Sequence, residues 1–193
     1  MITIIVLALS VLTVWTVCHV GFVLFSLLMC WRFSVFKMRG TSNYNNFSVL
    51  RYVWGFIRHP TTVPKLCTQL WNSTGYMSNR IAPNQERGWT YDDNVALSKQ
   101  RASALRDIGE SVLNPTSFNE FIGGTWSPFE YMVFWTAGVV LAALFGKKMF
   151  YFPEDILGGS RGCRKEQEIA RQFGMPLIPV PALLNQHTQG SKA

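Results

Sequence analysis

The stretch YFPEDILGGSRGCRKEQEIARQFGMPLIPV (residues 151–180) contains the pattern that decides the fold. A short apolar strand is predicted over 149–152, and a glycine-rich turn follows at 158–162. The next residues carry apolar side chains at three- and four-residue spacing, which predicts a helix that ends at Gly174. Residues 177–180 then predict a second short strand.

Strand, glycine-rich turn, helix and strand form half of a doubly wound α/β fold, in which ligands bind where the turn leaves the strand. The free N–H groups of the turn and the helix dipole favour an anion at that point. Glu166 follows about one turn inside the predicted helix. We therefore expect its carboxylate to face the crevice.

The charge of the chain is unevenly distributed. The 193 residues carry a formal net charge of +7, and Glu86 is the first acidic residue. A basic segment that follows an apolar run is typical of a membrane-proximal region and less typical of nucleic-acid binding. The four cysteines and three histidines lack paired or metal-ligand spacing, so the sequence predicts reduced thiols, no metal site and no cofactor.

Residues 2–31 form an apolar run in which His19 is the one readily ionisable side chain. A helix that spans a bilayer needs about 20 such residues. A cleaved signal peptide is the alternative, but it has a positive start, a shorter core and a small-residue cleavage site. We expect residues 1–31 to be a single transmembrane anchor. Positive charge follows the run, so the rest of the chain is expected in the cytoplasm.

Residues 32–72 are basic and aromatic. Aromatic rings and cationic side chains beside a span suit the lipid headgroup region, although a stacking surface for single-stranded nucleic acid has the same composition. The position beside the anchor favours a juxtamembrane linker that lies on the bilayer surface. Residues 73–184 are then predicted to form the α/β domain, and 185–193 a disordered tail.

The first half of the predicted domain shows the same alternation of elements. Residues 75–81 predict a strand, and 92–108 predict an amphipathic helix capped by Asp92 or Asp93. A second strand is predicted at 111–113, with a turn directly after it. Strand, helix and strand with short connections imply a right-handed parallel unit.

The apolar segment 129–145 has two interpretations. It is short for a membrane span and has the length of a buried helix. A second span is the alternative, and it would separate the two halves of the domain. As a buried helix the segment is apolar on nearly all sides, so one face would cover the sheet. The part from Val133 to Phe145 would then pack on a second copy of the chain.

Three stretches within residues 75–180 are similar, in the same order, to the nucleoside 2-deoxyribosyltransferase-like family. They are YMSNRI (76–81), NVALSKQRASALRDIGESVLNP (94–115), and FP (152–153) with GSRGCRKE (159–166). This resemblance implies a Rossmann-like (flavodoxin-like) parallel sheet domain, preceded here by the transmembrane helix. It also implies cleavage or transfer of the N-glycosidic bond of deoxynucleosides or their monophosphates.

In characterised members of that family a glutamate of this helix attacks the anomeric carbon, and Glu166 matches its position. The transition state resembles an oxocarbenium ion, which an adjacent carboxylate stabilises. By the same match, the first loop would hold sugar hydroxyls or a phosphate, and the glycine-rich turn would hold an anionic group. The candidate binding residues are Tyr76, Ser78, Asn79, Arg80, Gly159, Ser160, Arg161 and Gly162.

The chain also departs from the family pattern. Lys147 and the apolar stretch around Val139 stand where family members often carry acids that hold or protonate the leaving base, and Asn79 replaces a glycine. A non-catalytic nucleotide-sensing or scaffold membrane protein is therefore the alternative function, and a two-span membrane protein is a third. The expected partners are a nucleoside or nucleotide, membrane lipid and a second copy of the chain, and nucleic acid is not expected.

Overall fold

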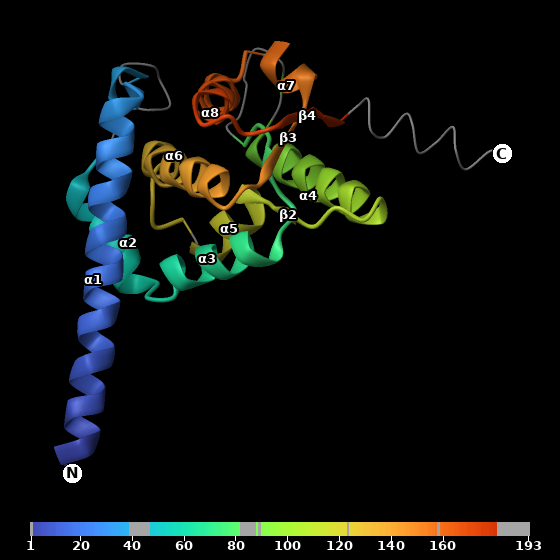
Figure 1. The fold of residues 1–193 in the computed structure, drawn as a ribbon. Helices are drawn as coiled ribbons and strands as arrows, with labels where there is room; N and C mark the ends of the chain where they lie inside the picture. The colour runs from blue at the N-terminus through green and yellow to red at the C-terminus, as the bar shows by residue number, and fades with distance from the viewer. Residues whose placement is uncertain are drawn as a thin grey trace.

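The computed structural model describes residues 2–38, 47–81, 88, 90–122, 124–157 and 159–180. These residues form a mixed α/β body with one long helix along its side (Figure 1). The predicted tail at 185–193 lies outside the described residues. In chain order the elements are α1 (Ile2–Arg32), the 3-10 helix η1 (Val35–Met38), α2 (Val49–Arg58), α3 (Thr62–Asn72), β1 (Gly75–Ser78), α4 (Tyr91–Asp107), β2 (Val112–Leu113), α5 (Pro115–Ile122), α6 (Pro128–Leu144), β3 (Lys148–Tyr151), α7 (Pro153–Leu157), α8 (Arg161–Gln172) and β4 (Leu177–Pro179).

Four short parallel strands form one sheet in the order β2-β1-β3-β4. Tyr76 pairs with Leu113 on one side and with Met149 on the other, and Met149 pairs in turn with Leu177. Helix α4 connects β1 to β2, and α8 connects β3 to β4. The predicted mixed α/β architecture with a parallel sheet is confirmed. The sheet is small, because its strands have only two to four residues each.

Helices cover both faces of the sheet (Figure 1). Successive strand residues point to opposite faces. Met77 and Phe150 pack with Leu105 of α4 in one cluster of buried side chains. Tyr76 and Met149 belong to the larger core, which includes α6 and α8. The helix that carries Glu166 therefore lies on the same face of the sheet as α6.

Two local features differ from the sequence prediction. Thr90 is the N-cap of α4, and Asp93 completes a capping box with it, so neither Asp92 nor Asp93 is the cap. Helix α5 begins directly after β2, where the sequence predicts a turn. Its first residue is a proline, which suits a helix start because the first N–H has no partner within the helix. Asn114 Oδ1 also accepts the N–H of Thr116.

Helix α6 is buried between the sheet and α1 (Figure 1). Phe134 of α6 packs on Phe22 of α1 with ring centroids 5.3 Å apart. The Cys30 thiol donates a hydrogen bond to the carbonyl oxygen of Val133. This segment is thus the buried helix of the two alternatives. The cover that the sequence assigned to a second copy of the chain comes from α1.

Residues 47–72 form α2 and α3 instead of the predicted linker, and both helices contribute to the main core. Helix α2 is also bound to α6, because the Arg51 guanidinium donates two hydrogen bonds of 2.8 Å to the buried Glu130 carboxylate. The linker prediction failed because aromatic rings that suit a membrane interface also build a protein core. The buried core side chains of these two helices are Tyr52, Phe56, Val63, Leu66 and Leu70.

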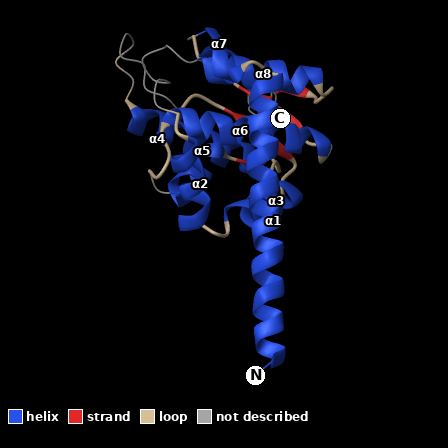
Figure 2. Ribbon diagram, turned by 90° about the vertical axis from the view of Figure 1, so that its left-hand side faces the viewer, coloured by secondary structure: helices blue, strands red, loops and turns tan. Residues whose placement is uncertain are grey.

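Helix α1 contains a segment, Leu12–Arg32, that is long and apolar enough to cross a membrane. One face of that segment packs on the domain. His19 Nδ1 lies 2.8 Å from the carbonyl oxygen of Trp15, and the His19 ring packs edge-on against Phe56. The N-terminal part of α1 projects beyond the domain (Figures 1 and 2). The packed face repeats at three- and four-residue spacing and contains Trp15, His19, Phe22, Ser26 and Cys30.

Candidate functional site

Glu166 projects from α8 onto β1. The Tyr76 hydroxyl donates a 2.7 Å hydrogen bond to Oε1 of Glu166, and the Ser78 hydroxyl donates a 2.6 Å hydrogen bond to Oε2. Tyr76 and Ser78 are alternate residues of β1, so both side chains point to the face that α8 covers. The carboxylate therefore faces the interior, and each of its oxygens has a hydroxyl donor.

The start of α8 places Glu166 in register with these hydroxyls. Ser160 is the N-cap, and its Oγ accepts the N–H of Cys163 at 3.3 Å. Gly159 has a φ of 85°, a left-handed conformation that glycine adopts at little cost. The turn thus reverses the chain after α7 and directs the first turns of α8 toward β1.

Burial controls the protonation of the site. Desolvation raises the pKa of Glu166 to about 7, and the hydrogen bonds from Ser78 and Tyr76 oppose this shift. Desolvation and the adjacent carboxylate hold the pKa of Tyr76 well above its ordinary value. Burial also raises the pKa of the Cys163 thiol to about 12, so Cys163 stays protonated and is a poor nucleophile. Glu166 is therefore the group of this cluster that changes its charge near neutral pH.

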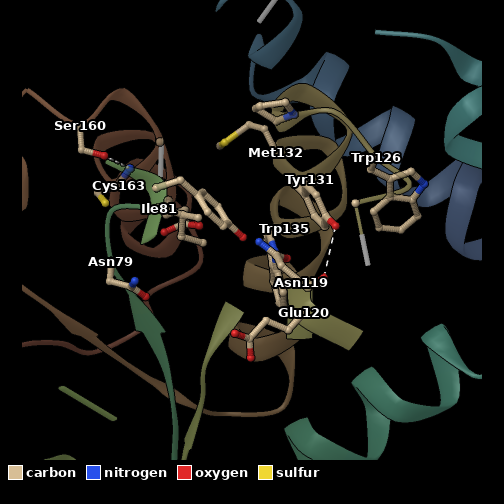
Figure 3. A pocket seen from close by; sticks show the side chains of 15 residues that line it. Asn79, Ile81, Asn119, Glu120, Trp126, Tyr131, Met132, Trp135, Ser160 and Cys163 are labelled. Atoms are coloured by element: carbon tan, nitrogen blue, oxygen red, sulfur yellow. Dashed lines mark hydrogen bonds between the residues drawn. The ribbon is translucent and has the colours of Figure 1, made fainter. Parts of the chain in front are cut away.

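A cavity of about 430 Å³ opens beside Glu166. In Figure 3, Asn79, Ser160 and Cys163 lie on one side of it, and Tyr131, Met132 and Trp135 lie on the other. The lining is mostly apolar, with amide and carboxylate groups at intervals. The lining residues are Asn79, Ile81, Tyr91, Asn119, Glu120, Gly124, Trp126, Pro128, Tyr131, Met132, Trp135, Ser160, Gly162, Cys163 and Glu166.

The rings of Tyr131 and Trp135, which form one wall of the cavity, are fixed by hydrogen bonds to α5. Trp135 Nε1 donates to Asn119 Oδ1 at 3.0 Å, and the Tyr131 hydroxyl donates to the Asn119 carbonyl oxygen at 3.3 Å. Glu120, the next residue, forms a 2.8 Å ion pair with Lys99, and both side chains are about half exposed. The two rings are thus held in place, while the carboxylate of Glu120 lies at the solvent side of the cavity.

The structure brings most of the predicted site residues together. Asn79, Ser160, Gly162 and Glu166 line the cavity. Tyr76 and Ser78 lie behind Glu166, where their hydroxyls hold its carboxylate. These six residues come from β1, the loop after it and the start of α8.

Three predicted residues lie elsewhere. Arg80 is buried and donates from its backbone N–H to the Asp155 carboxylate and from its guanidinium to the Asp155 carbonyl oxygen. Asp155 also accepts a 2.8 Å hydrogen bond from Arg101. Arg161 is exposed, and neither it nor Gly159 is among the lining residues. Arg80 therefore joins β1 to α7, and it does not contact the cavity.

The sequence patterns did not indicate the half of the cavity formed by α5, α6 and the segment between them. The start of α5 was predicted as a turn, and α6 was predicted as a helix that covers the sheet and packs on a second copy of the chain. One signal was present: Tyr131 and Trp135 are one helical turn apart, and each carries a polar group that needs a partner when buried. The missed side chains are Asn119, Glu120, Trp126, Tyr131, Met132 and Trp135.

Comparison of the chain with protein-family models, with curated proteins and with solved structures found no match. The described residues contain no group of three or more His, Cys, Asp or Glu side chains that would hold a metal ion. The chemistry of the cavity thus follows from its own residues.

Proposed function

We propose that the cavity binds a nucleoside and that Glu166 attacks the anomeric carbon of its sugar. The observation that carries this proposal is the buried carboxylate of Glu166 at the cavity wall, with one hydroxyl donor on each oxygen. The resemblance of the β1 loop and the start of α8 to the nucleoside 2-deoxyribosyltransferase-like family supports it. In this proposal the small parallel sheet is a reduced Rossmann-like fold.

The lining favours an uncharged nucleoside over its monophosphate. The rings of Trp126, Tyr131 and Trp135 suit stacking on a flat heterocycle, and the amides of Asn79 and Asn119 suit its polar edge. Among the described lining residues there is no lysine or arginine, and the charged side chains are carboxylates. A phosphate group would therefore lack a charged partner in the described part of the cavity.

The proposed reaction has two steps. Ionised Glu166 forms a bond to the anomeric carbon while the bond to the base nitrogen breaks, and the base leaves with the bonding electrons and takes a proton from water. Water then cleaves the glycosyl ester and restores the carboxylate, so the balance is nucleoside plus water to free base plus sugar. Tyr76 and Ser78 orient the carboxylate and stabilise its charged form by hydrogen bonding.

We also propose that α1 anchors the protein in a membrane as a single span, with the domain on the cytoplasmic side. The length and apolar composition of α1 support the span. The excess of positive charge after α1, with Glu86 as the first acidic residue, supports the orientation.

Base release from deoxynucleosides tests the proposal. The full-length chain in detergent would be incubated with deoxynucleosides and with their monophosphates, and free base would be separated by chromatography. We expect release that is lost in Glu166→Ala and retained in Glu168→Ala, which changes an exposed carboxylate of the same helix. Release that survives Glu166→Ala would contradict the role of this carboxylate.

A nucleoside sensor is the second candidate. Both oxygens of Glu166 already accept hydrogen bonds from the protein, which suits a carboxyl that shapes a binding site without reacting. A deoxynucleoside that raises the melting temperature of the protein without any release of base would favour this candidate over the enzyme.

A further inference from the structure

Helix α2 exposes an apolar half to the outside. Its core side chains, such as Tyr52 and Phe56, occupy one half of the helix circumference. The other half carries large apolar side chains and ends at Arg58. A contiguous exposed apolar surface is typical of a site that contacts a partner or a membrane. The exposed side chains are Val49 (48%), Leu50 (83%), Val53 (36%), Trp54 (56%) and Ile57 (52%).

Helix α1 has a similar outer face. Its apolar side chains recur at three- and four-residue spacing on the side opposite to the packed face. Helices α1 and α2 together form one edge of the molecule, with the sheet and the other helices to one side of them (Figure 1). The exposed apolar residues of this face are Val17 (65%), Val20 (52%), Leu24 (62%), Leu28 (53%) and Trp31 (73%).

The part of α1 that projects beyond the domain is too short to cross a bilayer (Figure 1). Residues 2–14 precede Trp15, whose indole is hydrogen-bonded to Pro60, and they extend about 20 Å at 1.5 Å per residue. The hydrocarbon core of a bilayer is about 30 Å thick. The remaining 10 Å, roughly, must come from residues 15–21, which already lie beside the domain.

The part of the domain that lies beside residues 15–21 of α1 is the C-terminal end of α2. Trp15 Nε1 donates a 2.8 Å hydrogen bond to the carbonyl oxygen of Pro60, which follows α2. The rings of His19 and Phe22 pack on Phe56 at centroid distances of 5.7 and 5.8 Å. The C-terminal half of α2, with Ile57 on its outer side, therefore lies at the depth that the span must occupy.

The other end of α1 sets an upper limit to the bilayer. The ammonium group of Lys165 in α8 donates a 3.2 Å hydrogen bond to the carbonyl oxygen of Phe33 and is paired with Glu168. Such charged groups belong in water or at the headgroups. The bilayer surface therefore lies between the levels of His19 and Phe33 along α1.

We propose that the outer faces of α1 and of the C-terminal half of α2 form one lipid-facing surface, so that the domain is embedded in one leaflet. The occupant is a lipid bilayer, because the exposed apolar face of α2 adjoins the outer face of α1, whose segment Leu12–Arg32 is long and apolar enough to cross a membrane. Arg58, the exposed residue that ends α2, can extend its long side chain from this depth to the headgroups. This inference rests on the proposed single span of α1, which the label at position 7 tests separately, and it does not depend on the proposed nucleoside chemistry.

Spin-label accessibility tests the proposal on the full chain in vesicles of phosphatidylcholine and phosphatidylglycerol. Cys18 and Cys67, the two cysteines that are not buried, are replaced by serine. A nitroxide is then placed at Ile57→Cys, Leu50→Cys or Leu157→Cys, and its collisions with oxygen and with a water-soluble nickel chelate are measured. Leu157 is the matched control, because its side chain is 83% exposed on α7, as Leu50 is on α2.

We expect oxygen collisions to dominate at position 57 and nickel collisions to dominate at position 157. Position 50 should be intermediate, because it lies about 10 Å further along α2 from the buried end. A label at Leu7→Cys should report hydrocarbon and show that α1 is inserted. Nickel accessibility at position 57 equal to that at 157 would overturn the proposal. So would a label at 57 that neither reagent reaches and that shows spin–spin broadening, because a second copy of the chain would then cover α2.

Discussion

Replacement of Glu166 by glutamine measures how much the ionisation of Glu166 lowers the free energy of unfolding. Burial raises the pKa of Glu166 from an ordinary value of 4.5 to about 7. The folded state therefore binds this proton more tightly than the unfolded state does. The resulting contribution to stability is fully present below about pH 4.5 and is lost as the pH rises through about 7.

The size of the effect follows from the pKa. The difference between a pKa of 4.5 and one of about 7 corresponds to about 3 kcal/mol of stability that ionisation of Glu166 removes. Glutamine has the shape of the protonated carboxyl group and does not ionise. The stability of Glu166→Gln relative to the natural chain should therefore grow by about 2–3 kcal/mol between pH 5 and pH 8. For a chain of this length that corresponds to roughly 5–10 °C in melting temperature.

Thermal unfolding in detergent, followed by tryptophan fluorescence across this pH range, measures the difference. Subtracting the natural chain from the variant cancels the titration of all other groups. Glu168→Gln, which changes an exposed carboxylate on the same helix, should show little pH-dependent difference. A difference for Glu166→Gln that stays constant with pH would refute the reasoning, because the carboxylate would then be hydrated. The same variant should lose base release, so stability and activity should change in opposite directions.

Two other variants, and one control, test the packing and the polar contacts. In Gly55→Ala the new Cβ would lie 1.9 Å from Trp126 Nε1, so we expect a large fall in melting temperature. Gly21→Ala, where a Cβ meets nothing within 4 Å, should be close to neutral, and an equal fall in both would contradict this account. Tyr76→Phe removes a donor that lowers the pKa of Glu166. In Tyr76→Phe the pH at which ionisation of Glu166 begins to lower the free energy of unfolding, measured at its midpoint, should rise by about one pH unit. A fall of this midpoint would count against the hydrogen bond.

The strands and the helix that carries Glu166 were predictable because their signals are local. A four-residue strand between turn residues and a helix that ends at glycine need no distant contact to be recognised. The inward direction of Glu166 was expected from its position in the first two turns of the helix that follows the glycine-rich turn. Asn79 and Ser160 were expected at the site from the resemblance to the nucleoside 2-deoxyribosyltransferase-like family, and both line the cavity.

The remainder of the site depends on contacts between distant segments. Asn119 and Trp135 are 16 residues apart, and their hydrogen bond exists because α5 and α6 fold back on each other. Arg80 was expected at the ligand, but Asp155, 75 residues away, binds it. Residues 47–72 were interpreted as a linker because the sequence does not show that α6 offers a buried carboxylate to Arg51. Local patterns contain no information about such pairs.

The position of α6 between the sheet and α1 has a practical consequence. A shortened chain that begins at residue 73, the natural choice for a water-soluble fragment, would lose α1, α2 and α3 together. The Phe134 ring would lose its contacts with Phe22 and Phe56, and Glu130 would keep a buried charge without Arg51. Helix α1 and the sheet thus share one hydrophobic core, so the protein should be purified and assayed with its hydrophobic N-terminus attached.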